Sequence, residues 1–141
     1  MQSQYPARGK IVRSEGALEV FAPAHTSYQL HLAFAGDAAV LAPGNTAVVI
    51  RVQARKVLGV IGGGNFVAPI YGPPRTLQGR IIQLDGRQMV LQCGFPVVVD
   101  LPQEADALDL TFGPLQVGGR VNVAAMPGAS FELCEAPAAA H

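Results

Sequence analysis

The sequence predicts an all-β protein of two tandem small barrels, each of about five strands, with little or no helix. Three observations predict this class. Short runs that alternate between apolar and polar residues recur with turn signals between them, at the spacing of roughly 8–12 residues that is typical of barrels and sandwiches. The 141 residues include 16 Gly and 11 Pro, spread along the chain, which disfavour long helices. The third observation is an internal repeat.

The repeat is clearest in two eight-residue stretches, residues 9–16 (GKIVRSEG) and residues 79–86 (GRIIQLDG), which lie 70 positions apart. Both read Gly, a base, two branched aliphatic residues, a turn that ends in an acid, and Gly. Further matches follow in the same order, 30–34 with 108–112, 41–44 with 115–118, and 57–60 with 131–134. Such a repeat indicates two copies of one unit. The alternative is chance similarity between Val-rich strands separated by Gly turns.

The first unit is expected at residues 1–60. Its predicted strands are residues 8–13, 18–21, 28–34, 46–54 and 57–60, and we expect the last of these to close the unit. A period of two along residues 46–54 places four apolar side chains inside, those of Val48, Ile50, Val52 and Ala54. The same period places Arg51, Gln53 and Arg55 together on the outer face.

A Gly- and Pro-rich joint at residues 61–76 leads to the second unit at residues 77–141. The apolar middle of the joint, residues 66–71, is expected to pack against a barrel. Strands of the second unit are predicted at residues 77–83, 89–93, 97–101, 108–112, 120–126 and 130–135. One helical turn is expected at residues 102–107, and residues 136–141 are expected to form a frayed tail.

Composition predicts a soluble, cytoplasmic protein. Half of the residues are hydrophobic and 14% are charged, but no apolar run is long enough to span a bilayer. The N-terminus lacks the basic and apolar segments of a signal peptide. We therefore expect no insertion into a membrane.

The charges balance over the whole chain but are unevenly distributed. Residues 1–75 carry seven Lys or Arg and three Asp or Glu, a net charge of +4, whereas residues 76–141 carry three and seven, a net charge of −4. This indicates either an anionic partner for the first half or attraction between the halves, within one chain or between chains. We favour the second interpretation and expect a homo-oligomer or a protein partner. We expect no nucleic-acid partner, because such binding needs a larger basic surplus and exposed aromatic platforms.

The most coherent polar stripe consists of Arg51, Gln53 and Arg55, with Lys56 beside them. Guanidinium groups bind phosphate, other oxyanions and carboxylates in a bidentate manner. The stripe is therefore the candidate ligand-binding site. The alternative is that it forms the solvated side of a strand.

No metal, cofactor or catalytic site is expected. Residues 59–64 (GVIGGG) resemble a phosphate-binding loop, but no Gly-Lys-Ser/Thr follows, so a flexible joint is predicted. His25 and His31, the latter on the outward face of its strand, are expected to be solvated, because a metal would need further converging ligands. No Ser lies in a Gly-x-Ser-x-Gly context. Without a Cys-x-x-Cys motif, Cys93 and Cys134 are expected to be thiols, buried as most such thiols are.

Five features of the first unit occur in order: Gly-x-Ile-Val (9–12), Leu-x-Leu-x-Phe (30–34), Pro-Gly-Asn (43–45), VVIRV (48–52) and VLGV (57–60). In this order the chain resembles the TOBE and Mop modules. These are small oligonucleotide-binding-fold (OB) barrels, found as regulatory domains of transporter ATPases and as free-standing tandem molybdate-binding proteins. The resemblance covers both units, rests mainly on residues 44–60, and implies OB-like barrels and an oxyanion ligand. Molybdate-binding copies open with Ser-Ala-Arg-Asn, where this chain has residues 6–9 (PARG) and 76–79 (TLQG).

These observations predict a non-catalytic binding or assembly module that self-associates through its oppositely charged halves. The alternative is a small-oxyanion-binding protein of the TOBE/Mop type, for a ligand such as molybdate or phosphate. A third hypothesis is an enzyme with an unrecognised site, which would require a deep polar pocket with a convergent acid and base.

Overall fold

The structure, a computed structural model, describes residues 5–37, 41–111 and 113–134. Its strands are β1 (Ala7–Glu15), β2 (Leu18–Pro23), β3 (Gln29–Phe34), β4 (Gly44–Val60), β5 (Phe66–Ala68), β6 (Tyr71–Gly72), β7 (Thr76–Asp85), β8 (Gln88–Gln92), β9 (Pro96–Asp100), β10 (Leu108–Asp109), β11 (Arg120–Ala125) and β12 (Ser130–Leu133). The all-β prediction is confirmed, and the predicted helical turn contains a short 3₁₀ helix, η2 (Ala105–Ala107). In the part of the chain so described, no helix has the length and apolar character needed to cross a membrane.

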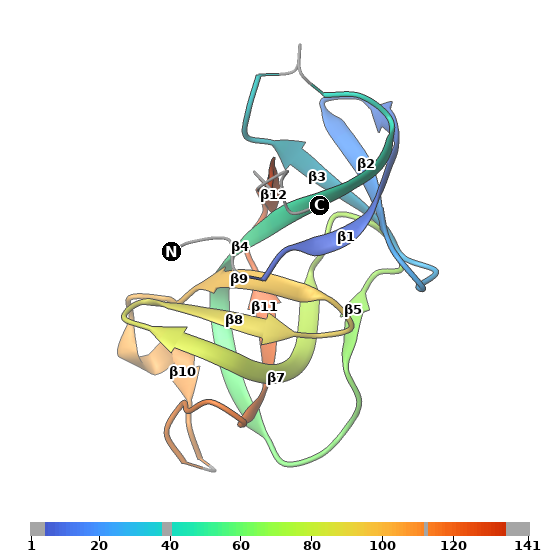
Figure 1. Ribbon diagram of the computed structural model, residues 1–141. Coiled ribbons are helices and arrows are strands. Elements are labelled where there is room, and N and C mark those ends of the chain that lie inside the picture. Colours follow the sequence, from blue (N-terminus) through green and yellow to red (C-terminus); the bar gives the residue numbers. More distant parts are fainter. Residues whose placement is uncertain (1–4, 38–40, 112, 135–141) are drawn as a thin grey trace.

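Strand β4 is the element that connects the whole fold (Figure 1). It is 17 residues long and joins the two strands predicted at residues 46–54 and 57–60. Its N-terminal part pairs with β1 and β12, its middle with β9, and its C-terminal part with β10 and β11. Residues 57–60 therefore do not close the first unit as predicted. No turn separates them from residues 46–54, so the strand continues to partners in the second half of the chain.

The strands form two groups that share β4. In the first group β1 pairs with β2, β2 with β3, β3 with β12, β12 with β4, and β4 with β1. In the second group β7 pairs with β8, β8 with β9, β9 with β4, β4 with β11, and β11 with β7. Strand β12 belongs to the predicted unit 77–141, and the C-terminal part of β4 belongs to the predicted unit 1–60. Each group thus takes a strand from the other group's stretch of chain.

The hairpins β1–β2 and β7–β8 have the same register at an offset of 70 residues. The equivalent features are the opposed pairs Glu15–Leu18 and Asp85–Gln88, and the register shifts that follow Ile11 and Ile81. The two turns contain Gly16 and Gly86, whose φ angles are 62° and 61°. Glycine adopts this left-handed conformation without a steric cost, which explains the Gly at the end of both sequence stretches.

Gly9 and Gly79, which begin the two stretches, are needed for a second reason. A Cβ on Gly9 would collide with the backbone oxygen of Ala22 on β2, and a Cβ on Gly79 with that of Gln92 on β8. Glycine in a strand interior often marks such a close approach of two backbones. The Gly at the start of each repeated stretch is therefore required by the close packing of the two strands in its hairpin.

One predicted match between the halves is wrong. Residues 108–112 were matched to residues 30–34, which lie in β3. Of these, Leu108–Asp109 forms the short strand β10, which pairs with β4 outside the second group's order, and Phe112 lies outside the described residues. The strand that follows the β7–β8 hairpin, and runs parallel to β4 as β3 runs parallel to β12, is β9. The Leu-x-Leu-x-Phe similarity reflected alternation alone.

The main core is filled from both groups. The four residues predicted to point inward from β4 are at most 2% exposed, which confirms their orientation: Val48, Ile50, Val52 and Ala54. Phe131 of β12 stacks on Phe34 of β3, with ring centroids 5.1 Å apart. Full burial of one large apolar side chain contributes about 1.5–3 kcal/mol to stability. Cys93 is a thiol buried in this core, as expected.

The joint carries two short strands. Strand β5 pairs with β7, and β6 pairs with β3. Val67 is buried, so this part of the joint's apolar middle packs against the sheet. Ile70 and Tyr71 are about half exposed, at 56% and 50%. The joint is therefore held by strand pairing at two points.

Candidate functional site

The stripe predicted on β4 is partly engaged in contacts with neighbouring strands. Arg51 forms an ion pair with Glu132 on β12, with 3.3 Å between Nε and Oε1. The Gln53 side-chain amide donates to the backbone oxygens of Ala54 at 3.1 Å and Asp100 at 3.3 Å. These contacts connect β4 to β12 and β9.

Arg55 and Lys56 are exposed, but they do not converge with Arg51. The β4–β11 pairing shifts between Ala54 and Lys56, and Arg55 is the additional residue. Such a bulge redirects the side chains that follow it. Arg55 and Gln53 line one hollow of about 400 Å³ together with Glu104, whose carboxylate disfavours an anion there. The structure thus brings two of the four predicted residues to one hollow and leaves the other two elsewhere.

A hollow of about 650 Å³ lies on the outer side of β1. It lies between β1, the segment that joins β2 to β3, the start of β4 and the end of β12. Its polar lining comprises Arg8, Lys10, His25, Thr26, Asn45 and Thr46, with Cys134 at its border. We call this cavity the basic hollow. Sequence reasoning did not identify it, because its walls come from four segments that are distant in the sequence.

Alternation along β1 explains why two bases point into the basic hollow. Ala7 and Ile11 are buried in the core, whereas Arg8 and Lys10 are exposed on the opposite face. Lys10 lies directly opposite Asn45 on β4, and residues opposed in this way project to the same side of a sheet. The repeated Gly-base pattern could have indicated Lys10 as a candidate site residue, since it placed a base next to a constrained glycine.

The charged side chains that the structure describes in the lining of the basic hollow are all basic. Among the described residues its lining includes no Asp or Glu. Neither Arg8 nor Lys10 forms a side-chain hydrogen bond or an ion pair with another described residue. Within the described part of the chain, these two cations in one concave surface therefore have no counter-charge.

His25 stands at the border of the basic hollow in an uncommon backbone conformation. Its φ is 64°, in the left-handed region that few residues other than glycine adopt. Its segment is held by hydrogen bonds from Thr26 Oγ1 to the Pro23 oxygen and from the Ala24 amide to the Arg8 oxygen, both 2.8 Å. The side chain is exposed, as predicted. The two hydrogen bonds hold His25 beside the two bases.

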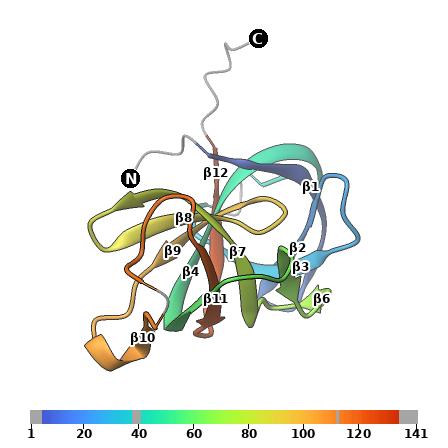
Figure 2. The same cartoon turned by 90° about the horizontal axis from the view of Figure 1, so that it is seen from below.

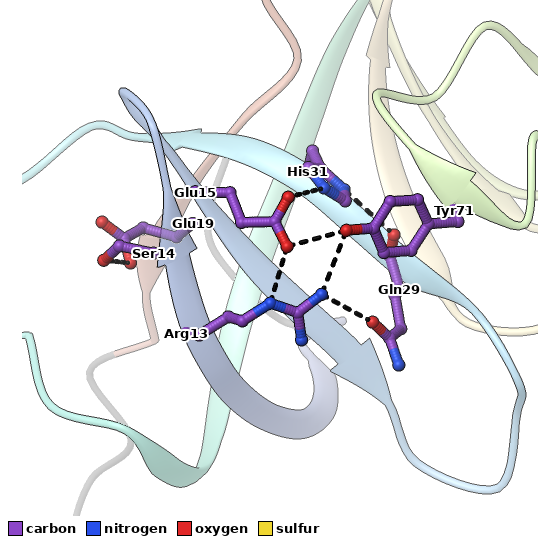
Figure 3. A network of polar contacts seen from close by, with 7 residues as sticks. All are labelled: Arg13, Ser14, Glu15, Glu19, Gln29, His31 and Tyr71. Atoms are coloured by element: carbon purple, nitrogen blue, oxygen red, sulfur yellow. Dashed lines mark hydrogen bonds and ion pairs between the residues drawn. The ribbon is translucent and has the colours of Figure 1, made fainter.

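A second polar feature, the Glu15 cluster, comprises Arg13, Glu15, Gln29, His31 and Tyr71 (Figure 3). The Glu15 carboxylate accepts hydrogen bonds from the Tyr71 hydroxyl at 2.7 Å and from Arg13 Nε at 2.6 Å, and it lies 3.1 Å from His31 Nε2. The Tyr71 hydrogen bond, followed by those of Arg13 and His31, lowers the pKa of Glu15 to about 2. Glu15 is therefore a carboxylate over the whole neutral range.

The expectation that His31 is solvated is wrong. Its residue exposure is 8%, because β3 is covered on both faces. Leu30 and Leu32 face the core, and the Tyr71 ring packs edge-on against the imidazole at 4.6 Å between centroids. The covering residue comes from the joint, 40 positions along the chain, so alternation along β3 could not reveal it.

The Glu15 cluster connects the first strand group to the joint through hydrogen bonds. Both ring nitrogens of His31 face oxygen atoms of the cluster or of its own strand, Glu15 Oε1 and the Gln29 backbone oxygen. The Ser14 hydroxyl donates to Glu19 at 2.7 Å rather than facing His31. The hydrogen-bonding groups are thus used in holding β1, β3 and β6 together.

Within the described ranges, no group of three or more His, Cys, Asp or Glu is placed to hold a metal ion. The basic hollow combines open volume with two bases that have no carboxylate partner among the described residues. Compared with protein-family models, with curated proteins and with solved structures, the chain matches none of them.

Proposed function

We propose that the protein is a non-catalytic binding module whose ligand is a small oxyanion, held in the basic hollow by Arg8 and Lys10. The observation that carries this proposal is a pair of bases that line one cavity and have no carboxylate partner among the described residues. Two like charges in one concave surface repel each other and attract an anion. A bound oxyanion would supply the missing counter-charge.

The lining offers complementary chemistry for such a ligand. The Arg8 guanidinium can bind two oxygens at once, whereas the Lys10 ammonium provides a compact charge. Asn45 and Thr46 add neutral donors from β4. Hydrogen bonds in which the partners are charged are stronger than neutral ones, so these residues favour a tetrahedral oxyanion of the phosphate or molybdate kind.

The resemblance to TOBE and Mop modules supports the same ligand class. Arg8 stands where their Ser-Ala-Arg-Asn stretch has its Arg, although Pro6 and Gly9 replace the Ser and the Asn. We further infer that the two strand groups are OB-type barrels, copies of one ancestral unit that exchange a strand. The common register of the two hairpins supports this inference.

A second candidate function is self-association. The charge difference between the halves is in part used within one chain, where Arg51 pairs with Glu132. Apolar surface favours association independently, because Ile61 is 79% exposed and Val117 is 62% exposed. Sedimentation at low and high salt distinguishes the two causes: association through charges weakens with salt, whereas apolar association does not.

The oxyanion proposal is tested by calorimetric titration with molybdate, phosphate and sulfate, against chloride at matched ionic strength. One of the three is expected to bind, and Arg8→Gln is expected to weaken it at least tenfold, since a hydrogen bond to a charged group contributes about 1.5–3 kcal/mol. Arg75→Gln is the matched control, because Arg75 is exposed and lies outside the hollow's lining. If Arg55→Gln weakens binding and Arg8→Gln does not, the stripe on β4 is the site and the basic hollow is not.

A further inference from the structure

The second strand group carries its own pair of opposed bases. At the offset of 70 residues, Lys10 corresponds to Arg80, and each follows the glycine at which two strands approach closely. Arg80 of β7 lies directly opposite Arg120 of β11, as Lys10 of β1 lies opposite Asn45 of β4. Figure 2 shows β7 and β11 as neighbouring strands. In the first group a base, Lys10, therefore faces an amide, whereas at the equivalent place in the second group Arg80 faces another base, Arg120.

Both arginines project from the outer face of these strands. Ile81 and Val121, the next residues along β7 and β11, are 1% and 2% exposed and point into the core. Residues directly opposed on neighbouring strands share one side of the sheet. The next outward pair is Gln78 with Asn122, whose side chains are joined by a hydrogen bond of 3.0 Å. This contact marks the face on which Arg80 and Arg120 lie.

Like charges directly opposed on two strands destabilise a sheet. Within the described residues neither Arg80 nor Arg120 forms an ion pair with a carboxylate. Arg120 donates from one amino group to the Gly63 oxygen at 2.9 Å and to Asn65 Oδ1 at 2.7 Å. Its Nε–H is buried and has no partner among the described residues.

The glycine-rich joint forms a wall beside this pair. The Gln78 amide donates to the Gly64 oxygen at 2.9 Å, and Gly63 beside that amide has a φ of 93°. Side chains other than glycine rarely adopt this conformation, so glycine is favoured where the joint touches the outer face of β7. On the equivalent face of the first group the basic hollow lies open. The joint therefore covers part of the surface beside Arg80 and Arg120 without neutralising their positive charge.

We propose that Arg80 and Arg120 form a second anion site, which holds one tetrahedral oxyanion between their guanidinium groups beside Gly63 and Asn65. The Arg80 guanidinium can bind two oxygens of such an anion, and the second amino group of Arg120, which is not the one bonded to Gly63 and Asn65, can donate to a third. The proposal of this site is based on the strand register, and it does not depend on ligand binding in the basic hollow.

Titration with inorganic phosphate tests the second site. In the double variant Arg8→Gln, Lys10→Gln, the basic hollow is disabled, and one equivalent of phosphate is expected to bind. Adding Arg80→Gln is expected to weaken that binding at least tenfold, whereas adding Arg75→Gln leaves it unchanged. The Arg80 side chain is exposed and forms no hydrogen bond or ion pair with a described residue, so its replacement is expected to leave the fold intact. In chloride without phosphate, Arg80→Gln is expected to melt at the same temperature as the wild type or higher, because repulsion is removed.

The outcomes separate the two sites. If the double variant binds no phosphate while the wild type binds one equivalent, the second site is overturned and the basic hollow stands. If Arg80→Gln abolishes binding in the wild type and the double variant has no effect, the basic hollow is overturned instead. If the wild type binds no phosphate, the second site is overturned. A lower melting temperature of Arg80→Gln in chloride would reveal a stabilising partner of Arg80 within the protein and would also overturn it.

Discussion

Tyr71, in the joint, donates its hydroxyl hydrogen to the Glu15 carboxylate of β1 across 2.7 Å. Tyr71 also accepts a hydrogen bond from Arg13 at 3.1 Å and covers the imidazole of His31. Through one residue, the segment between the two strand groups is thus bound to the first group at a charged position. This contact makes the stability of the protein sensitive to the protonation of Glu15.

Stability is expected to fall in acid because of Glu15. Its pKa is lowered from 4.5 to about 2 in the folded protein, so the folded state favours the carboxylate. The resulting stabilisation is fully present above about pH 4.5 and is lost as the pH falls towards 2. Urea-unfolding midpoints measured between pH 6 and pH 2 check this. In Glu15→Gln the part of the pH dependence that is due to Glu15 is expected to vanish, and an unchanged slope would contradict the assignment.

Tyr71→Phe is expected to raise the pKa of Glu15, because it removes the largest contribution to the lowered value. The ring and its contact with His31 remain, so the change isolates the hydroxyl group. NMR titration of the Glu15 side chain measures the effect directly. Tyr5→Phe serves as the control, since Tyr5 packs against a separate small apolar cluster. A Glu15 pKa that stays at its low value in Tyr71→Phe would show that Arg13 and His31 suffice.

Gly9→Ala and Gly79→Ala are each expected to destabilise the protein by about 1–3 kcal/mol or more, the range of overpacking. In both, the added Cβ meets a backbone oxygen, which cannot move aside as a flexible side chain can. Gly62→Ala is the control, because a Cβ there meets nothing within 4 Å. Chemical denaturation compares the three variants. Similar losses at Gly9 and Gly79 would support equivalent roles, and a loss at Gly62 as large as theirs would contradict the steric explanation.

Phe131→Ala is expected to cost about 3–5 kcal/mol, because it empties a fully buried aromatic site. Phe131 lies on β12, which the end of the chain contributes to the first strand group. Strand exchange makes each group depend on the other, so one cooperative transition is expected in both the wild type and the variant. Calorimetry combined with denaturant unfolding checks both statements. Two separate transitions in the wild type would show that the groups unfold independently.

Cys93 is expected to resist alkylation in the folded protein. Burial raises the pKa of its thiol to about 12, and the thiolate is the reactive form. Mass spectrometry after brief treatment with iodoacetamide at pH 8 measures the modification of each cysteine. Cys93 is expected to react only after unfolding. Cys134, which borders the basic hollow, is expected to be the faster of the two and to be slowed by an oxyanion bound there.

The sequence predicted the local elements well because their causes are local. Alternation along β4 correctly assigned Val48, Ile50, Val52 and Ala54 to the core. The repeated stretch correctly located two hairpins, whose turns require the left-handed Gly16 and Gly86. The candidate site was less accessible. Arg51 and Gln53 lie where the period predicted, but their partners Glu132 and Asp100 belong to strands that no local pattern could assign as neighbours.

The all-β class, the paired hairpins and the inward face of β4 follow from local patterns in the chain, because side-chain alternation and glycine conformations act over a few residues. The pairing of strands across the chain does not follow from them: β12 enters the first group, the end of β4 enters the second, and β9 takes the place expected of residues 108–112. The same holds for the burial of His31 by Tyr71 and for the basic hollow, which four segments enclose. The physical reason is that these features depend on the free energy of non-local packing, which many strand sequences satisfy equally well when considered alone.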